Sequence, residues 1–196
     1  MDVSRETEAL FTQYAALIRK WNPAINLVAP GTLPDLETRH IADSAQLFQH
    51  AGAKSGLWCD LGSGGGLPGV VAAIQGRDHP VTFRLIESDS RKSAFLNTAR
   101  RELGLTRLNI VNARIEQAPP AAADIVSARA LAPLPQLLTY ISRHIKPGGS
   151  AILLKGRSWQ QEVDAARQAW QFNLETWPSM TEPGAAILKL TNLEHG

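Results

Sequence analysis

The sequence predicts an α/β protein whose core is a seven-stranded, mostly parallel sheet, preceded by a helical N-terminal extension. From residue 57 onward, short apolar runs alternate with helical stretches, which is the pattern of successive βαβ units around a parallel sheet. A glycine-rich loop follows the first apolar run, at the edge where such sheets bind ligands. The length of 196 residues, 44% of them hydrophobic, suits a single domain that buries its own core.

Residues 1–50 are expected to form the helical extension, and residues 56–196 the α/β core. An apolar stripe at helical spacing marks the first helix: Leu10, Tyr14, Leu17, Ile18 and Trp21. We expect this helix to end at Pro23 and to be followed by a loop with three prolines over residues 22–34. A second helix is expected from about Leu36 to about His50, with Asp35 as its N-cap.

Five short apolar runs are expected to be the parallel strands: 57–61, 81–86, 108–111, 124–127 and 150–154. The clearest helix between them runs from Asp89 to Leu103, where Asp89 or Ser90 can cap the start and Gly104 can end it. The biased stretch at 118–123 is expected to be a loop. A helix over 159–170 and an antiparallel strand pair over 172–177 and 186–190 complete the predicted seven-stranded sheet.

Charge and cysteine content exclude several classes of protein. The 20 Lys+Arg against 18 Asp+Glu are too balanced for a histone-like chain, so any nucleic-acid surface must be local. Cys59 is the single cysteine and cannot form an internal disulfide, and no paired spacing of zinc ligands occurs, so we expect no metal. The first residues lack the features of a signal peptide, and no 18-residue apolar window occurs. These observations predict a cytoplasmic protein that does not act at a membrane.

The glycine-rich loop reads Asp60-Leu61-Gly62-Ser63-Gly64-Gly65-Gly66-Leu67-Pro68-Gly69 and opens a helix. Gly64, Gly66 and Gly69 satisfy the dinucleotide-binding pattern G-x-G-x-x-G. This pattern alone is a weak signal, so an NAD(P)-dependent oxidoreductase remains an alternative. The acidic residue before the first glycine, in Asp60-x-Gly62-x-Gly64-x-Gly66, resembles the S-adenosylmethionine loop of class I methyltransferases. Glu87 ends the second strand, where a carboxylate can accept hydrogen bonds from ribose hydroxyls of either cofactor. Glu87 therefore indicates an adenosine site without choosing the cofactor.

The segment after the fourth strand limits the reaction type. It reads Ser127-Ala128-Arg129-Ala130 and lacks the Pro-Pro-aromatic motif of enzymes that methylate exocyclic amines. A pyrimidine C5 methyltransferase needs a nucleophilic cysteine here, whereas Cys59 lies in the first strand. An acceptor with its own lone pair, such as guanine N7, needs neither a base nor a nucleophile, only alignment and placement of charge.

Four further motifs accompany the glycine loop: Trp21-Asn22-x-x-x-Asn26-Leu27, Arg39-His40-x-x-Asp43-Ser44, Ala128-Arg129-Ala130 and Leu154-Lys155-Gly156. From about Tyr14 to about Arg157 the sequence resembles the bacterial RsmG family, also called glucose-inhibited division protein B. The resemblance implies a class I S-adenosylmethionine-dependent methyltransferase with a Rossmann-like core. It implies methylation of N7 of guanine 527 in the decoding-region loop of 16S rRNA, with S-adenosylhomocysteine as the product. The implied partner is small-subunit ribosomal RNA or a ribosomal subunit assembly state, and no obligate protein partner is evident.

The loop pattern and the resemblance together give the predicted site residues. The cofactor-binding set lies on the loop and at the ends of the following strands: Asp60, Gly62, Gly64, Gly66, Leu67, Glu87, Ile115, Glu116 and Arg129. Within it, the resemblance places Glu87 at the ribose and Ile115 and Glu116 beside the adenine. Arg129 and Lys155 are the predicted catalytic residues, expected to orient an RNA phosphate or the guanine, because both follow strands at the carboxyl edge.

Other candidates have plainer interpretations. His40 and Asp43 are expected to be a structural pair that ties the N-terminal helices to the sheet, and Trp21 is expected to pack in the core. The basic groups Arg91-Lys92, Arg100-Arg101 and Arg143-His144-x-Lys146 could together form an RNA track. A non-catalytic nucleotide-binding module of ribosome assembly stays open beside the oxidoreductase, because no obvious base is present.

Overall fold

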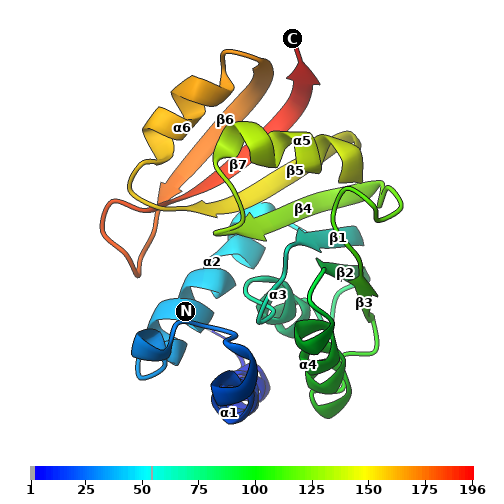
Figure 1. Cartoon of the computed structure of the whole chain (residues 1–196), viewed down its shortest axis with the longest axis vertical. Helices are drawn as coiled ribbons and strands as arrows, with labels where there is room; N and C mark the ends of the chain where they lie inside the picture. The colour runs from blue at the N-terminus through cyan, green and yellow to red at the C-terminus, as the bar shows by residue number, and fades with distance from the viewer. Residues whose placement is uncertain (1–2, 54) are drawn as a thin grey trace.

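The structure is a computed structural model that describes residues 3–53 and 55–196 of the chain. Seven strands form one sheet in the order β3-β2-β1-β4-β5-β7-β6. Their bounds are β1 Gly56–Leu61, β2 Val81–Glu87, β3 Leu108–Asn112, β4 Ala123–Arg129, β5 Ile145–Lys155, β6 Trp170–Pro178 and β7 Ala186–His195. The first five strands pair in parallel, and β7 lies antiparallel to both β5 and β6 (Figure 1). The predicted sheet, with its antiparallel final pair, is confirmed.

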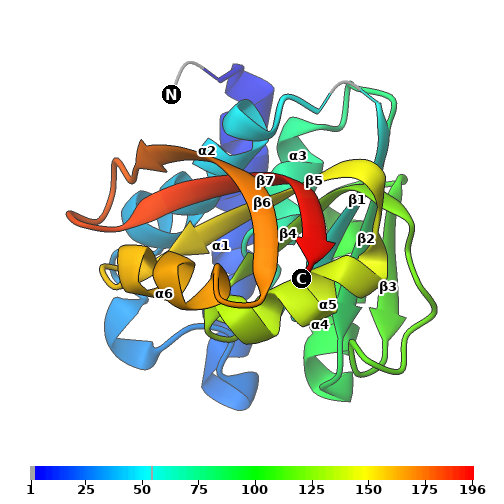
Figure 2. The ribbon, with the colours of Figure 1, turned by 90° about the horizontal axis from the view of Figure 1, so that it is seen from above.

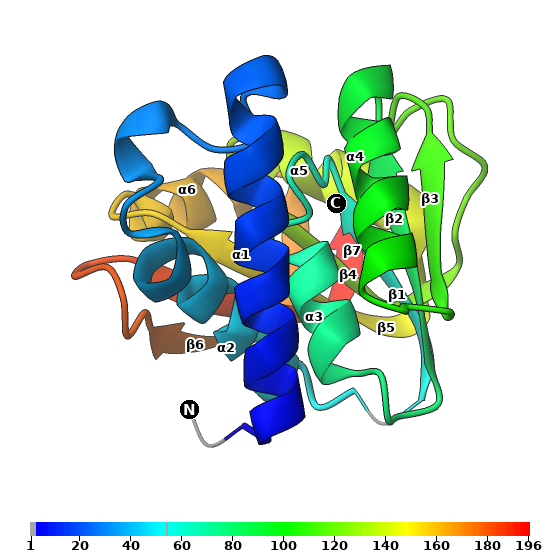
Figure 3. The same cartoon turned by 90° about the horizontal axis from the view of Figure 1, so that it is seen from below.

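Helices cover both faces of the sheet, so both faces have a core. One face carries α1 (Arg5–Ile25), α2 (Ala42–Ala51), α3 (Gly69–Gln75) and α4 (Ser90–Glu102), which stand in front of the sheet in Figure 3. The other carries α5 (Leu134–His144) and α6 (Trp159–Ala166), seen in front in Figure 2. Because side chains alternate along a strand, Trp58 of β1 joins the first core and Cys59 the second. Residues of α1 and α2 belong to the same apolar cluster as the strands.

The connection from β3 to β4, residues 113–122, contains no helix. The predicted loop at 118–123 is therefore confirmed, apart from its last residue, which begins β4. The connection starts at the carboxyl edge of the sheet, where residues 113–116 line a cavity beside the glycine loop, and it ends at the amino edge, where β4 begins.

The first helix does not end at Pro23 as predicted. Helix α1 continues to Ile25, and Asn26 ends it in the left-handed conformation (φ 48°), with its N–H donated to the Asn22 carbonyl. The side chain of Asn22, only 2% exposed, accepts the Val28 N–H (2.8 Å) and so fixes the direction of the following loop. Proline removes one hydrogen bond from the last turn, but the tertiary contacts of Asn22 and Ile25 outweigh this local cost.

The second predicted helix has two parts. Residues Leu36–Ile41 form a π-helical segment, and the regular helix α2 begins at Ala42. Asp35 makes no side-chain capping hydrogen bond, so its predicted role as N-cap is wrong. The widened π-helical turn carries His40, and such turns occur frequently at functional sites.

The remaining differences concern ends of elements. Strand β5 begins at Ile145, five residues earlier than predicted, and α6 ends at Ala166, four residues short of the predicted end. Trp170 is in β6 because it pairs with His195 of β7. Helix α4 starts as expected, with Asp89 accepting the N–H groups of Arg91 and Lys92. Within the described part of the chain, no helix has the length and apolarity needed to cross a membrane.

Candidate functional site

The glycine loop joins β1 to α3 across the end of β2. Ser63 donates its N–H to the Ile86 carbonyl (3.1 Å), and Gly66 donates its N–H to the Ser63 carbonyl (2.7 Å). Gly62, Gly64 and Gly66 all have positive φ (63°, 56° and 84°), a conformation that glycine adopts without strain. A Cβ added at Gly64 would meet nothing nearer than the Gly62 carbonyl at 3.9 Å. Gly64 therefore presents its backbone to open space, where a ligand can approach it.

Glu87 connects the end of β2 to this loop. Its carboxylate accepts the Gly64 N–H at Oε2 (2.7 Å) and the Asp89 N–H at Oε1 (2.8 Å). The residue is only 7% exposed, yet it lines a cavity. A carboxylate has about four lone-pair positions, so each oxygen keeps one for a further donor such as a hydroxyl.

Two cavities meet at the loop, and both are lined by Gly62 and Gly64. The first, which we call the β2-side cavity, has a volume of about 280 Å³ and lies between Glu87, the β3–β4 connection and α5. Ile115 and Glu116 line it, as the resemblance implied, together with Gln136 and Tyr140 of α5. Hydrogen bonds from its own backbone N–H and from Tyr140 lower the pKa of Glu116.

The second cavity, which we call the β4-side cavity, has a volume of about 210 Å³. Its lining is mostly apolar side chains and backbone, and the two titratable side chains in it are those of His40 and Arg129. The full lining is Leu27, Val28, His40, Gly62, Ser63, Gly64, Gly65, Leu67, Arg129 and Ala130. The predicted site residues Leu67 and Arg129 are thus brought to the same wall as Gly62 and Gly64. Arg129 lies at the end of β4, and His40 comes from the π-helical turn.

Arg129 and His40 form a hydrogen bond of 2.7 Å between Nη2 and Nδ1. The Asp43 carboxylate lies 3.8 Å from the same Nη2. Burial lowers the pKa of His40 to about 4, with the charges of Arg129 and Arg39 acting in the same direction. His40 is therefore neutral at neutral pH, and its Nδ1 accepts the Arg129 proton. His40 and Asp43 tie the N-terminal helices to the sheet, as expected, but each does so through its contact with Arg129 of β4 and not as a pair.

Two predicted cofactor residues do not line either cavity. Asp60 is fully buried beneath the loop, where its Oδ1 accepts the Ser127 hydroxyl (2.6 Å), which in turn accepts the Trp58 indole N–H (2.8 Å). Gly66 is buried in the turn, where a Cβ would lie 2.5 Å from Val70 and 2.7 Å from the Tyr14 hydroxyl. Neither residue is part of the lining of either cavity. Their buried contacts instead give both of them a role in shaping the loop.

Lys155 lies at the end of β5, as predicted, but its ammonium is already engaged. It forms an ion pair with Glu162 of α6 (2.5 Å) and donates to the Ala132 carbonyl (3.0 Å). Glu162 also accepts the Leu134 N–H (2.8 Å). The Lys155 side chain is only 10% exposed, and it is not part of the lining of either cavity. Contact with RNA through Lys155 stays a prediction, while its visible contacts hold the β4–α5 connection.

The three basic groups do not form one track, because they lie at opposite edges of the sheet. Arg91 and Lys92 begin α4 at the carboxyl edge, whereas Arg100 and Arg101 lie at the other end of that helix. The third group precedes or begins β5 at the amino edge, where His144 is fully buried and hydrogen-bonds to the Ile115 carbonyl (3.0 Å). Of the three groups, only the first has a side chain in the lining of the site, that of Lys92.

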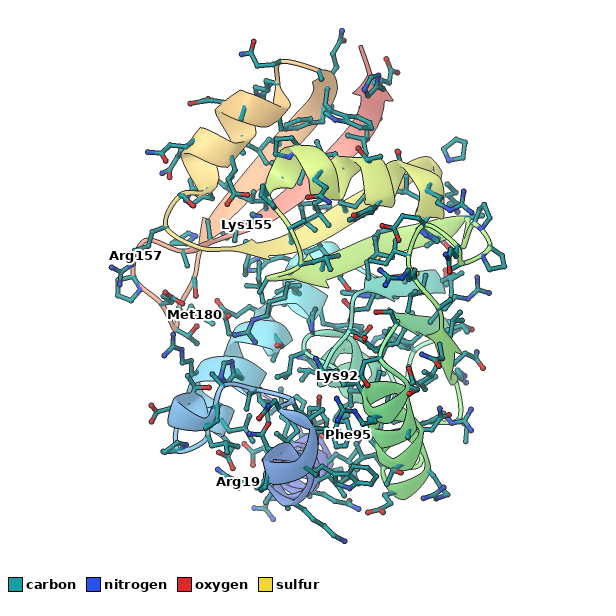
Figure 4. The ribbon with its side chains drawn as sticks, in the orientation of Figure 1. Arg19, Lys92, Phe95, Lys155, Arg157 and Met180 are labelled. Atoms are coloured by element: carbon teal, nitrogen blue, oxygen red, sulfur yellow. The ribbon has the colours of Figure 1, made fainter. Side chains whose placement is uncertain are left out.

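Several residues that line the site were not predicted. Lys92 lines the β2-side cavity, and Figure 4 shows it on the same side of α4 as Phe95, which packs against Trp21 of α1. Trp21 is partly buried and packs against the apolar cluster on this face of the sheet, which confirms its predicted packing in the core. Tyr14 donates its hydroxyl proton to the Gly65 carbonyl and so braces the loop from α1. The available signal was the hydroxyl of Tyr14 within the apolar stripe of α1, and the spacing of Gln136 and Tyr140, which lie four residues apart on α5 and hydrogen-bond to each other.

Comparisons with known proteins agree with this geometry. A family model described as rRNA small subunit methyltransferase G matches residues 7–188. A protein of Paracoccus denitrificans named ribosomal RNA small subunit methyltransferase G is 54% identical over 195 residues, covering 100% of each chain. One of the same name from Paramagnetospirillum magneticum is 44% identical over 194 residues, covering 99% of this chain and 93% of that protein.

Solved structures show the same fold at low sequence identity. A SAM-dependent methyltransferase from Aquifex aeolicus matches with a TM-score of 0.62 and 12% identity, covering 91% of this chain and 97% of that one. An RNA methyltransferase from Salinibacter ruber in complex with S-adenosyl-L-homocysteine matches with a TM-score of 0.58 and 18% identity, covering 76% and 88%. The predicted class I methyltransferase fold is confirmed.

Proposed function

The chain belongs to the rRNA small subunit methyltransferase G family, and from this premise we propose that it methylates N7 of a guanine in 16S ribosomal RNA. The specific nucleotide proposed is guanine 527, the known target of the family. The proposed methyl donor is S-adenosylmethionine and the product S-adenosylhomocysteine. The proposed macromolecular substrate is small-subunit rRNA, free or in an assembling subunit, in the cytoplasm.

The residues present fit this donor. Gly64 offers backbone with open space in front of it, and Glu87 keeps lone pairs for two ribose hydroxyls. Ile115 and Glu116 would hold the adenine in the β2-side cavity. Since Gly62 and Gly64 line both cavities, a ligand that lies across the loop has its other end in the β4-side cavity. When bound, S-adenosylmethionine supplies an activated methyl group on a positively charged sulfur.

The observation that carries the proposed acceptor is the absence of a free base in the β4-side cavity. Among the described residues that line it, only His40 and Arg129 titrate. The Nδ1 lone pair of His40 is used by Arg129, and a guanidinium keeps its proton. An acceptor that must lose a proton, such as an exocyclic amine, would find nothing to take it. Guanine N7 attacks through its own lone pair and loses no proton, so this cavity suits it.

Arg129 is proposed to orient the guanine. The guanidinium has five N–H donors in a fixed plane, and the bond to His40 uses one. A donor to guanine O6 would align the base while leaving the neighbouring N7 free to react. The apolar side chains of Leu27, Val28 and Leu67 offer a dry wall for the flat base. Catalysis here is alignment and exclusion of water, with no proton transfer.

The experiment is methyl transfer to unmodified small-subunit RNA, free and in 30S particles, followed by mass mapping of the modified base. We expect one methyl group on guanine N7 and no transfer to RNA that carries 7-deazaguanine at the target. Gly64→Val should abolish binding of S-adenosylhomocysteine, since its side chain fills the ligand's space and φ of 56° strains any branched residue. Methylation of an exocyclic amine would contradict the N7 assignment. NAD binding without S-adenosylhomocysteine binding would instead favour the oxidoreductase.

A further inference from the structure

We propose that Thr32 and His40 are positioning residues for Arg129, forming a directed hydrogen-bond relay that holds the guanidinium on the wall of the β4-side cavity. This inference rests on the proposed function, because it assigns the relay to the docking of the methyl acceptor. Neither residue needs to touch the RNA or the methyl donor for this role.

The direction of every bond in the relay follows from the contacts. The Thr32 hydroxyl lies 2.8 Å from the Ala29 carbonyl, which can only accept, so the hydroxyl donates its single proton there. Thr32 Oγ1 lies 2.8 Å from His40 Nε2, and having spent its proton it must accept one from this nitrogen. His40 is therefore the Nε2–H tautomer, which leaves Nδ1 as the acceptor for Arg129 Nη2 at 2.7 Å.

The relay ties together three separate parts of the site. Thr32 ends the short 3-10 helix Pro30–Thr32, and Ala29 precedes it; both belong to the connection after α1 that also carries Leu27 and Val28 to the cavity wall. His40 is in the π-helical turn, and Arg129 lies 89 residues further along the chain, at the end of β4. A guanidinium on a long flexible side chain loses entropy when it must adopt one geometry, and the relay provides that geometry before the substrate arrives.

Asp43 supplies the balancing charge and links a fourth segment. Its Oδ2 faces Arg129 at 3.8 Å, while its Oδ1 accepts the hydroxyls of Ser179 (3.0 Å) and Thr181 (2.7 Å) from the β6–β7 loop. The Nη2 group of Arg129 therefore faces both a neutral acceptor, His40, and a carboxylate, Asp43. Figure 4 shows Met180, at the tip of this loop, on the same side of the molecule as Lys155 and Arg157.

The test combines single-turnover methyl transfer, at saturating S-adenosylmethionine, with a double-mutant cycle. We expect His40→Ala to lower the rate by about tenfold to a hundredfold, the loss typical of a hydrogen bond to a charged group. His40→Asn, which restores an acceptor near Nδ1, should recover part of the rate. In an Arg129→Ala background, His40→Ala should have no further effect, because the relay then has nothing to hold. His195→Ala, at an exposed histidine at the end of β7, is the matched control.

Thr32 gives a second, milder test. Thr32→Val keeps the shape but removes the hydroxyl that fixes the tautomer, and it should lower the rate, whereas Thr32→Ser should not. Binding of S-adenosylhomocysteine should be unchanged in both Thr32 variants, because Thr32 is not part of the lining of either cavity. Additive effects of His40→Ala and Arg129→Ala, or a wild-type rate for His40→Ala, would overturn the proposal.

A readout independent of activity separates this inference from the proposed function. Nitrogen-15 NMR of the histidine side chains in the wild-type protein should show His40 as the Nε2–H tautomer at neutral pH. The Nδ1–H tautomer would overturn the relay whatever the enzyme does. The Nε2–H tautomer in a protein that transfers no methyl group to RNA would contradict the proposed function and leave the hydrogen-bond arrangement standing.

Discussion

At the scale of single residues, Glu87 joins the glycine loop to the proposed ribose site. Glu87→Ala removes the acceptor of two backbone N–H groups as well as the proposed ribose contact. We expect it to weaken S-adenosylhomocysteine by about 1–3 kcal/mol, the usual loss for a charged hydrogen-bonding partner, as measured by calorimetry. Glu102→Ala, on the exposed end of α4, is the control and should bind normally. Normal binding by Glu87→Ala would place the ribose elsewhere.

The burial of the Asp60 carboxyl makes the stability of the fold depend on pH. Desolvation raises the pKa of this carboxyl to about 6, against the opposing hydrogen bonds from Ser127 and Ser63. Since the folded pKa exceeds the unfolded value of 3.8, this carboxyl favours folding below about pH 4, and the contribution is lost as pH rises through 6. Relative to Asp60→Asn, the wild type should lose up to about 3 kcal/mol of unfolding free energy between pH 4 and pH 7. Urea titrations of both proteins measure this, and identical pH dependences would contradict it.

At the scale of elements, the ion pair of Lys155 and Glu162 fastens β5 and α6 to the β4–α5 connection, whose Leu131 and Ala132 line the β2-side cavity. Two roles of Lys155 can be separated by experiment: a structural role, in which its ion pair stabilises the packing of β5 and α6 against the β4–α5 connection, and the predicted contact with RNA. If the role is structural, Lys155→Ala and Glu162→Ala should each lower the free energy of unfolding by about 1–2 kcal/mol, and the two effects should be non-additive in the double variant.

If Lys155 contacts an RNA phosphate, Lys155→Ala alone should reduce the salt dependence of RNA binding by about one counterion. Glu162→Ala should then leave that salt dependence unchanged. We expect the structural role, seen as a loss of stability in thermal unfolding, because the Lys155 side chain is only 10% exposed and its ammonium is already paired with Glu162. A changed salt slope with unchanged stability would establish the RNA contact instead.

The proposed reaction predicts a simple pH profile for the activity of the protein. No proton leaves guanine N7, so the chemical step at saturating RNA should be level from about pH 7 to pH 8.5. Activity should fall only in the acid range near pH 4, as His40 gains a proton and its Nδ1 becomes a donor that faces Arg129. Burial lowers the pKa of His40 to about 4, with the charges of Arg129 and Arg39 acting in the same direction and those of Asp43 and Asp35 opposing them. A rate rising tenfold per pH unit near neutrality would reveal a general base.

The order of strands and helices along the chain, the glycine loop and the acidic end of β2 could all be predicted from the sequence. These features are local, because strand runs, turn glycines and strand-end carboxylates are set by neighbouring residues. The parallel connections then placed Gly62, Glu87, Arg129 and Lys155 at one edge of the sheet, as predicted.

Which polar groups are free to act could not be predicted, because it depends on contacts between segments far apart in the chain. Lys155 is paired with Glu162, Asp60 is buried beneath the loop, and Arg129 is held by His40 across 89 residues of chain. Even the end of α1 was decided by the buried side chain of Asn22, against the local signal of Pro23. The physical reason is common to all four. A polar side chain's role depends on the partner that satisfies it, and partners distant in sequence meet only after the helices have packed on the sheet.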